Sequence, residues 1–470
     1  MFREKGYDHR EALFGIPPYG GSITQNVYYA DSDLCDARVN TRIGFPSRAE
    51  DESGNQMPWP SPYILMVDRG GCTFVTKVRN AQRSGAAGVI IADNTCLCSA
   101  GDSCVNKGFE CEEREPIMAD DGSGSDISIP SFLMFKQDAD VIKKSLMNQN
   151  IIQMQMSWAL PTPDDRVEYS LWTTPVEAVS RDFERQFVHA AKAFGNKARF
   201  QPHMYIYDGV KSNCLGADGE NECYNLCTNN GRYCSPDPDN DLDKGISGQD
   251  VIAESLRRIC IWKLYGEKDG IGSQWWDYVN EFMYRCAMQG FFTDTQCIQD
   301  ASDIANVDHK KVESCMQDSG GLTGDNVNTL LEDELNAKDV AGVVIIPAVR
   351  VNKVPIRGGL EFETIFGAVC AGYAAGTTPR VCQTCELCPD QLTCTIEKSC
   401  TALEKANNAV SLPIFAGAIL ILAVVFGIIG FIQHKRASDN VRRQVKGIIA
   451  EYMPLDEEND LNTAIDAEIS

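Results

Sequence analysis

The chain has 470 residues, enough for two or three domains, and its 66 acidic against 43 basic side chains give a formal net charge of −23. A body this acidic argues against nucleic-acid binding, because phosphate backbones repel it. It would suit a basic ligand, although acidic surfaces also serve solubility. All 20 cysteines lie between Cys35 and Cys400, an asymmetry that an oxidising compartment on one side of a membrane produces.

The first part of the chain, up to Trp158, has the pattern of alternating strands and helices. Residues 63–67 form an apolar run before Arg69-Gly70-Gly71, which predicts a buried strand. Residues 75–84 carry apolar side chains at helical spacing, and residues 89–92 predict the next strand. This strand-helix-strand unit favours parallel pairing.

A polar insertion interrupts this pattern at residues 96–126. It contains four cysteines, several carboxylates and the string Gly122-Ser-Gly-Ser. We expect a surface loop stapled by disulfides. Residues 151–158 then alternate apolar and polar side chains, as a half-buried strand does.

A second domain follows the linker signal Pro161-Thr-Pro-Asp-Asp. Its predicted elements are a strand (167–172), a helix (176–194), a strand (200–207), helices within a segment of eight cysteines (251–265 and 275–288), two strands around Pro347 (341–346 and 348–351) and a closing helix (361–374). Strand-helix-strand, a helical insertion and strand-Pro-strand-helix is the order of a thioredoxin-type domain. Pro347 occupies the place of the thioredoxin cis-proline, but a sequence does not give the isomer.

A dense cysteine patch, Cys-Gln-Thr-Cys-Glu-Leu-Cys, begins at Cys382, and its last cysteine is Cys400. Its Cys-x-x-Cys spacing is compatible with a zinc site. Outside the cytosol, disulfide pairing is the favoured interpretation.

Residues 412–432 form a run of 21 residues without a charged side chain. At about 1.5 Å per residue this run would span roughly 31 Å, the thickness of a bilayer core. Lys435 and Arg436 follow, so the positive-inside rule places the C-terminus in the cytosol. The first ten residues lack the apolar core of a signal peptide, which a type I membrane protein needs.

The tail contains Tyr452-Met453-Pro454-Leu455, a tyrosine-x-x-bulky-apolar string. Two side chains three positions apart can enter two pockets of an adaptor while the extended backbone pairs with a strand edge. The string alone is weak, but about 20 residues from a bilayer, in a polar tail, it indicates a sorting signal.

Longer strings carry a family resemblance. Gly15-Ile-Pro-Pro-Tyr-Gly-Gly, Asp68-Arg-Gly-Gly-Cys-Thr-Phe and Gly85-Ala-Ala-Gly-Val-Ile-Ile-Ala-Asp resemble a protease-associated (PA) domain. Asp165-Arg-Val-Glu-Tyr-Ser-Leu-Trp and Trp275-Trp-Asp-Tyr-Val are similar to the central region of plant-type vacuolar sorting receptors, whose tails use Tyr-Met-Pro-Leu.

The resemblance implies an α/β and α+β multidomain chain: a PA domain (1–158), a thioredoxin-like domain with a cysteine-rich helical insertion (159–378), a short cysteine-rich stem (379–411), one transmembrane helix (412–432) and a cytosolic tail (433–470). The family usually has epidermal-growth-factor-like repeats, one with a calcium-binding pattern, where this chain has only about 20 cysteine-rich residues. We therefore expect no cofactor, with calcium control left open. The family's cysteine pair after the Leu-Trp-Thr strand is also absent, since residues 174–178 read Thr-Pro-Val-Glu-Ala.

The resemblance also assigns candidate site residues. Arg69 matches the arginine that contacts cargo peptide in the family, and a guanidinium there can hold a carbonyl or carboxylate with two parallel hydrogen bonds. The alternative is a structural arginine paired with Asp68 or a loop carboxylate. Asp120 and Asp121 match an acidic loop that closes over cargo in relatives, although a solvated charge run explains them equally well.

These features predict a type I receptor, not an enzyme, that binds soluble cargo in the secretory pathway. We expect it in Golgi, trans-Golgi and prevacuolar or endosomal membranes, with a clathrin adaptor as the tail's partner and homo-oligomerisation left open. The alternatives are a PA-domain protease or a thiol oxidoreductase. The chain lacks protease motifs, and the thioredoxin-like helix begins without a cysteine. A PA-domain ubiquitin ligase would need a RING, and the tail has no cysteine.

Release of cargo in an acidic compartment suggests a pH-sensitive site. Only five histidines are available, so we expect carboxylates to carry the change. Clustering of Asp120, Asp121 and Asp126 predicts that some of them titrate above the ordinary range.

Overall fold

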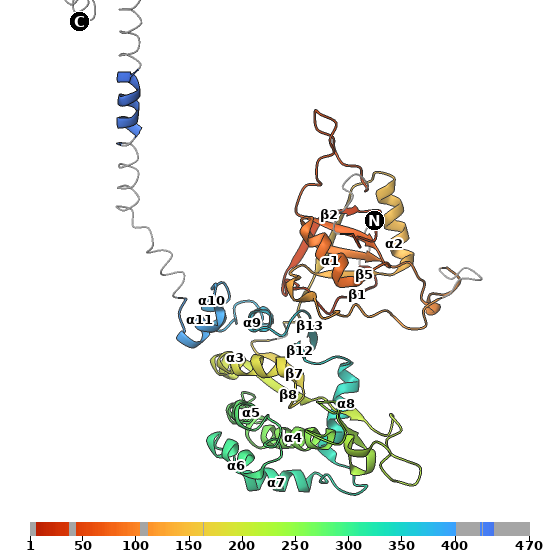
Figure 1. Ribbon diagram of the computed structural model, residues 1–470, viewed down its shortest axis with the longest axis vertical. Coiled ribbons are helices and arrows are strands. Elements are labelled where there is room, and N and C mark those ends of the chain that lie inside the picture. Colours follow the sequence, from red (N-terminus) through yellow and green to blue (C-terminus); the bar gives the residue numbers. More distant parts are fainter. Residues whose placement is uncertain are drawn as a thin grey trace, which may run out of the picture. The chain divides into compact units, whose positions relative to one another are not determined.

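The computed structural model describes residues 6–36, 44–103, 111–162, 164–400, 424 and 426–436 (Figure 1). The chain divides into two units, Met1–Cys400 and Thr401–Ser470. Residues 426–436 are helical, but no helix within the described ranges is both long and apolar enough to cross a bilayer. Most of the expected span at 412–432, and the whole Tyr452–Leu455 signal, lie outside the described residues.

The first domain is built on a six-stranded sheet with the order β1-β5-β4-β3-β2-β6. The four central strands run parallel, and the two edge strands pair antiparallel. The strands are β1 (His9–Glu11), β2 (Ser22–Tyr29), β3 (Tyr63–Asp68), β4 (Ala86–Ala92), β5 (Ser131–Met134) and β6 (Ile152–Ser157). The predicted parallel strand-helix-strand unit is confirmed as β3, α1 (Phe74–Arg83) and β4.

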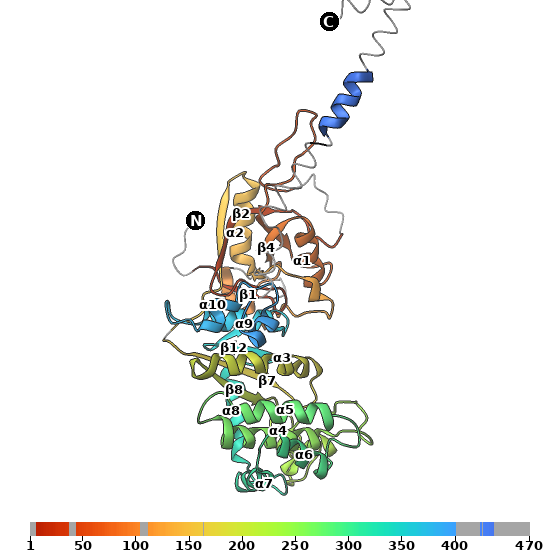
Figure 2. The same ribbon diagram turned by 90° about the vertical axis from the view of Figure 1, so that its left-hand side faces the viewer.

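Two helices cover opposite faces of this sheet because alternate residues of the buried strands point to opposite sides. Helix α1 packs Val75 and Val78 against one face, in the same cluster as Leu65. Helix α2 (Lys136–Met147) packs Ile142 against the other face, in the same cluster as Ile64. Figure 2 shows the two helices on either side of the strands. The carboxyl ends of β3, β4 and β5 therefore meet at one edge of a buried sheet.

The second domain contains a four-stranded sheet with the order β13-β12-β7-β8, in which β7 and β8 are parallel. Its strands are β7 (Val167–Thr173), β8 (Ala198–Met204), β12 (Ala348–Val351) and β13 (Val354–Ile356), and its flanking helices are α3 (Ala178–Phe194) and α9 (Phe362–Ala371). Phe187 and Phe194 of α3 pack against Phe362 and Phe366 of α9, respectively, with ring centroids 5.7 and 5.5 Å apart.

An insertion between β8 and β12 carries five α-helices and a small sheet ordered β10-β11-β9. Its elements are β9 (Tyr207–Asp208), β10 (Cys227–Thr228), β11 (Tyr233–Cys234), α4 (Gly248–Ile261), a π-helical turn (Trp262–Gly266), α5 (Ser273–Arg285), α6 (Thr295–Ile304), α7 (His309–Asp318) and α8 (Thr329–Ala341). Trp275 and Trp276 of α5 are fully buried, so the insertion shares the core of the thioredoxin-like sheet.

Two details of this domain differ from the prediction. Residues 341–346 are not a strand, since α8 ends at Ala341 and residues 342–347 form no regular structure. The apolar residues 343–346 follow the end of the helix in a segment without regular structure, and a short apolar run does not by itself establish a strand. The Ile346–Pro347 bond is cis, and Pro347 lies directly before β12 instead of between two strands.

Disulfides connect the cysteines as expected for an oxidising compartment, and the described ranges hold no free cysteine. The pairs are Cys35–Cys72, Cys98–Cys111, Cys214–Cys223, Cys227–Cys234, Cys260–Cys315, Cys286–Cys297, Cys370–Cys382, Cys385–Cys394 and Cys388–Cys400. The patch that begins at Cys382 is therefore a disulfide cluster, as the favoured interpretation predicts.

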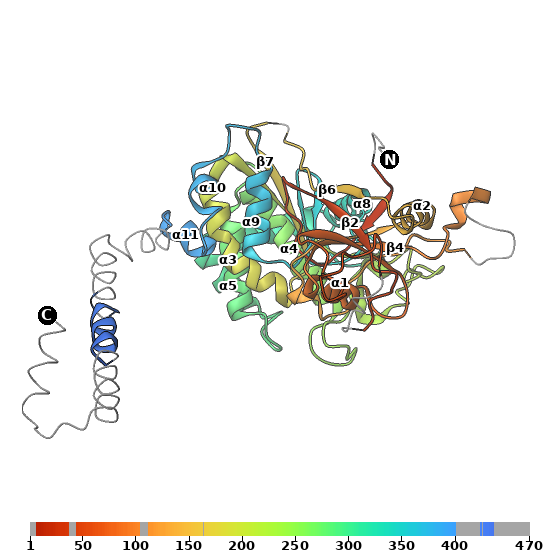
Figure 3. The same cartoon turned by 90° about the horizontal axis from the view of Figure 1, so that it is seen from above.

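The same patch forms two short helices, α10 (Arg380–Cys385) and α11 (Gln391–Glu397). Helix α11 packs on α3 and α9, and Figure 3 shows the four helices grouped together. Cys382, Cys385 and Cys394 are buried within the main core of the second domain. Residues 380–397 thus belong to the packed body of Met1–Cys400.

Candidate functional site

A tight turn joins β3 to α1 and carries Arg69. Gly70 and Gly71 have φ angles of +110° and +79°, which L side chains rarely adopt. A Cβ on Gly71 would lie 2.4 Å from the Asp33 carboxylate and 2.8 Å from the Cys35 sulfur. The turn therefore needs glycine at this position both for its backbone conformation and for space.

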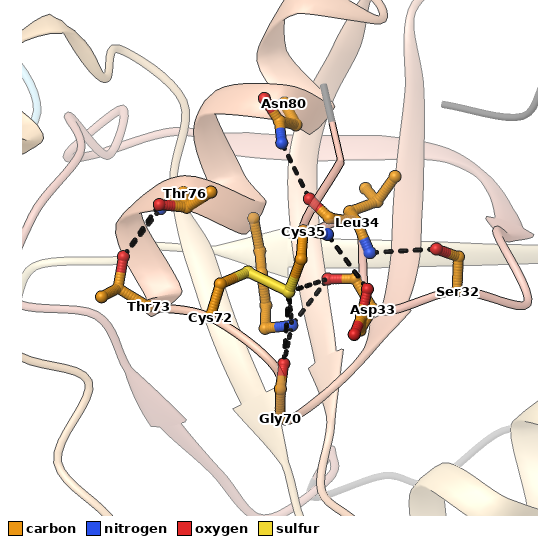
Figure 4. The surroundings of a disulfide bond; sticks show 10 residues. Ser32, Asp33, Leu34, Cys35, Gly70, Cys72, Thr73, Thr76 and Asn80 are labelled. Atoms are coloured by element: carbon orange, nitrogen blue, oxygen red, sulfur yellow. Dashed lines mark hydrogen bonds between the residues drawn. A yellow bond between two sulfur atoms is a disulfide. The ribbon is translucent and has the colours of Figure 1, made fainter. Parts of the chain in front are cut away.

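A disulfide and a buried lysine pack against the turn. Figure 4 shows the Cys35–Cys72 disulfide with Gly70 and Asp33 beside it. Lys77 of α1 is fully buried and donates to the carbonyls of Asp33, at 2.6 Å, and Gly70. Burial lowers the pKa of Lys77. These contacts hold the backbone directly after Arg69 against the Asp33–Cys35 segment, so the turn that carries this side chain is well anchored.

Asp68 points to a different set of partners. Its carboxylate accepts from the Tyr29 hydroxyl at 2.8 Å and lies 3.1 Å from Nζ of Lys143. The alternative in which Asp68 holds Arg69 therefore does not describe this structure.

Arg69 binds two other carboxylates. Its Nη1 donates to Oδ1 of Asp93 at 2.9 Å and to Oε2 of Glu112 at 3.0 Å, and its Nη2 donates to Oε1 of Glu112 at 2.8 Å. The Arg69 side chain keeps 21% of its surface exposed, whereas Asp93 is fully buried. The guanidinium thus lies at the surface end of a buried ion pair, with Glu112 as its outer partner.

The two carboxylates come from adjoining segments. Asp93 directly follows β4, and its backbone N–H donates to the carbonyl of Met134 in β5 at 2.9 Å. Its Oδ1 also accepts from the backbone N–H of Thr95, and its buried Oδ2 has no partner among the described residues. Glu112 is paired through its backbone with Cys96 and Cys98. The site therefore lies at the carboxyl ends of β3 and β4.

A cavity of about 550 Å³ lies beside these segments. The residues that follow Asp93, from Cys96 to Ala100, form one side of it, and the start of α2 forms another. Its lining mixes aromatic and charged side chains, including Tyr7, His9, Arg10, Phe135 and Lys136. The cavity is therefore more polar than most ligand pockets, which are lined mainly by apolar side chains, since six of its lining residues are acidic or basic.

Asp120 and Asp121 lie in a separate contact network. Asp120 accepts from the backbone N–H groups of Gly122 and Gly124, both at 2.9 Å. Asp121 accepts from the Ser123 N–H at 3.0 Å and from its hydroxyl at 2.6 Å. No described contact joins either carboxylate to Arg69.

The pH hypothesis for this loop is wrong for two of its acids. The hydrogen bonds from Ser123 hold the pKa of Asp121 below its ordinary value. Arg79 of α1, whose Nε and Nη2 both donate to the carboxylate of Asp126, does the same for the pKa of that residue. Donors and an arginine outweigh the repulsion between clustered carboxylates.

The thioredoxin-like domain offers no thiolate at the start of α3. Glu177 caps this helix, and its carboxylate accepts from the N–H groups of Val179 and Ser180. Cys214, Cys227 and Cys234, whose sulfurs cluster in the insertion, are each in a disulfide. The helix N-terminus that activates a cysteine in oxidoreductases therefore holds a structural carboxylate here.

The structural alternative for Arg69 named Asp68 or a loop carboxylate as its partner, and Glu112 is such a loop carboxylate, whereas Asp93 was not predicted. Asp93 closes the quoted Gly85-to-Asp93 string, and only the parallel sheet shows that it ends beside Arg69. Glu112 was one of several acids in a polar insertion. Lys77 sits on a helix whose apolar spacing gave no sign that a lysine would be buried.

Comparisons with known proteins agree with this architecture. Residues 23–142 match the model of the PA domain, and residues 167–370 match that of the vacuolar sorting receptor thioredoxin-like domain. The chain therefore belongs to the class of proteins that join a PA domain to a thioredoxin-like domain.

Within that class, the chain is related to the vacuolar-sorting receptors. It is 30% identical to vacuolar-sorting receptor 4 of Arabidopsis thaliana over 90% of this chain and 65% of that protein. It is 32% identical to vacuolar-sorting receptor 3 of the same plant and 31% identical to vacuolar-sorting receptor 1 of Pisum sativum, in each case over 80% of this chain and 58% of the relative. The chain thus spans about three fifths of the length of these relatives.

Proposed function

We propose that this protein is a non-enzymatic cargo receptor that binds soluble proteins in the secretory pathway and carries them toward a vacuole or lysosome. The relationship to vacuolar-sorting receptors and the PA and thioredoxin-like domains support this function. The observation that carries it is Arg69, a partly exposed guanidinium on a well-anchored turn at the carboxyl edge of a parallel sheet.

Arg69 is proposed to hold a carbonyl or carboxylate of a cargo peptide with its parallel donors. The neighbouring cavity gives room for a flanking peptide side chain. Asp120 and Asp121 are proposed to contact cargo only as part of the loop's surface, since their carboxylates are engaged with their own loop. Neither contact requires a cofactor, so we propose none and assign no role to calcium.

Residues 412–432 are proposed to span the membrane, and Tyr452, Met453, Pro454 and Leu455 to bind a clathrin adaptor in the cytosol. Golgi, trans-Golgi and prevacuolar or endosomal membranes are the compartments that such a tail would serve.

A capture experiment tests the cargo function. The whole chain is immobilised in detergent through a C-terminal tag and exposed at pH 7 to a defined mixture of purified soluble vacuolar hydrolases and cytosolic enzymes. Arg69→Lys serves as the control variant because it keeps the positive charge but loses the planar fork. We expect the wild type to retain hydrolases about tenfold better than Arg69→Lys, a difference of about 1.4 kcal/mol. Equal retention of hydrolases and cytosolic enzymes by the wild type would contradict the proposal.

A further inference from the structure

Glu112 places one of the chain's own carboxylates on the guanidinium that is proposed to bind cargo. Its two oxygens accept from Nη1 and Nη2 of Arg69 at 3.0 and 2.8 Å. This is the parallel, two-bond geometry that an incoming carboxylate would adopt. While Glu112 keeps this position, no other carboxylate can take the same pair of donors.

The position of Glu112 is fixed by its backbone and not only by its charge. Its N–H donates to the Cys96 carbonyl and its carbonyl accepts from the Cys98 N–H, both at 2.9 Å. The adjacent Cys111 is joined to Cys98 by a disulfide. The segment is therefore pinned to the residues that leave β4, a few positions after Asp93. A carboxylate held in this way is presented to Arg69 at a high effective concentration.

Glu112 nevertheless satisfies the site only in part. Asp93 is fully buried, and its Oδ2 has no hydrogen-bond donor among the described residues. A buried oxygen without a donor is unfavourable. The ionised Glu112 side chain only accepts hydrogen bonds, so it cannot supply the missing donor. A peptide carries N–H groups beside its carbonyl and carboxylate groups, and therefore can offer both an acceptor to Arg69 and a donor to Asp93.

We propose that Glu112 is a tethered competitor that sets the specificity of the Arg69 site. This inference rests on the proposed function. A simple anion offers the Arg69 guanidinium only hydrogen-bond acceptors, which Glu112 already supplies, and so it does not displace Glu112 from the site. A peptide that adds a donor for Asp93 displaces Glu112, whose exposed side can turn to solvent, since 30% of its side-chain surface is already accessible. The apparent affinity for any ligand equals its intrinsic affinity multiplied by the fraction of molecules in which Glu112 has left Arg69.

The test uses N-acetylglycine, which has a carboxylate beside an amide N–H, as the probe. N-acetylglycinamide, which lacks the carboxylate, is the matched control ligand. Dissociation constants are measured by calorimetric titration for the full-length wild type, for Glu112→Gln and for Glu113→Gln. Glu113 is the exposed neighbour of Glu112, so its replacement removes the same charge from the same segment without touching Arg69.

We expect Glu112→Gln to bind N-acetylglycine about tenfold more tightly than the wild type, because a neutral amide competes less well for the guanidinium. Glu113→Gln should match the wild type, and N-acetylglycinamide should show a smaller gain. The thermal midpoint of each variant checks that the fold is intact.

Two results would overturn the inference and are distinguishable from failure of the cargo proposal. Equal affinity of Glu112→Gln and the wild type, or an equal gain in Glu113→Gln, means that Glu112 is no competitor. Adding Arg69→Lys to Glu112→Gln separates the competitor role of Glu112 from the proposed ligand site at Arg69. If this change abolishes the binding that remains, the Arg69 site stands without the competitor; if it changes nothing, the probe does not use Arg69 and the proposed site itself is wrong.

Discussion

Replacement of Arg69 by alanine should destabilise the PA domain by about 3 kcal/mol and also remove cargo binding. The sequence alone suggests a loss of binding with the fold intact, but Asp93 is fully buried and Arg69 is its cationic partner. Removing one member of a buried ion pair leaves an uncompensated charge, which costs about 3–5 kcal/mol. The Asp93 bond to the Thr95 N–H remains, so we expect the lower end of that range. Thermal and urea unfolding of the chain measure the loss.

Arg69→Lys separates stability from binding. A lysine ammonium can still neutralise Asp93, so stability should fall by no more than about 1 kcal/mol. It cannot form two parallel bonds to one carboxylate, so cargo affinity should fall by about 1.5–2 kcal/mol, or 10- to 30-fold. If the lysine variant binds cargo like the wild type, the two-bond role of Arg69 is wrong. If the alanine variant is as stable as the wild type, Asp93 is not the buried partner that the geometry indicates.

Glu184→Gln should stabilise the thioredoxin-like domain at neutral pH and lose this effect in acid. Glu184 lies on α3, is fully buried, and has an oxygen without a partner among the described residues. Burial raises its pKa to about 7, against an ordinary value of 4.5, with Glu177 also raising it and Arg258 opposing the shift. Arg258 binds Glu254 at 3.1 Å, and no described hydrogen bond joins it to Glu184.

Proton linkage gives the direction in which the stability contribution of Glu184 changes with pH. A raised folded-state pKa means that the folded protein holds the proton more tightly than the unfolded chain, so this contribution to stability is complete below about pH 4.5 and is lost as the pH rises through 7. From pH 5 to pH 8 the loss is about 2–3 kcal/mol. Glutamine has no proton to lose, so the variant should unfold roughly 5–10 °C higher at pH 8 and near the wild-type temperature at pH 5.

Asp182→Asn is the control for this change, because Asp182 is an exposed acid on the same helix. Its effect should stay within about 0.5 kcal/mol at both pH values. A gain for Glu184→Gln that does not depend on pH would mean that Glu184 is not protonated in the folded protein near neutrality.

The fold was predicted correctly where a sequence pattern is compatible with only one local structure. The β3-α1-β4 unit was predicted from the apolar run at 63–67, the glycine pair after it and the helical spacing that follows. A parallel strand is buried on both faces, so nearly all of its residues must be apolar, and this makes it recognisable in a sequence. The edge strand β1 was missed because three partly exposed residues carry no alternation. The strand predicted at 341–346 is wrong because a short apolar run does not distinguish a strand from an irregular segment that follows a helix.

The candidate site divides in the same way. Arg69 could be found because a recognisable string surrounds it. A loop carboxylate was one predicted partner, but neither Glu112 nor Asp93 could be singled out, since they reach Arg69 only through sheet pairing and the Cys98–Cys111 disulfide. Asp120 and Asp121 were assigned to the cargo site by the family resemblance, whereas in the structure their carboxylates accept hydrogen bonds from turns within their own loop.

The most direct measurement of the central claim is the fate of soluble vacuolar hydrolases in cells of the source organism that lack this protein. The secreted fraction of hydrolase activity is measured in the medium, with re-expression of the wild type, Arg69→Lys, or a variant with Tyr452→Ala and Leu455→Ala. The cargo-receptor account predicts that loss of the protein raises the secreted fraction several-fold, that the wild type restores retention, and that neither variant does. Unchanged secretion in the absence of the protein, or full restoration by Arg69→Lys, would contradict it.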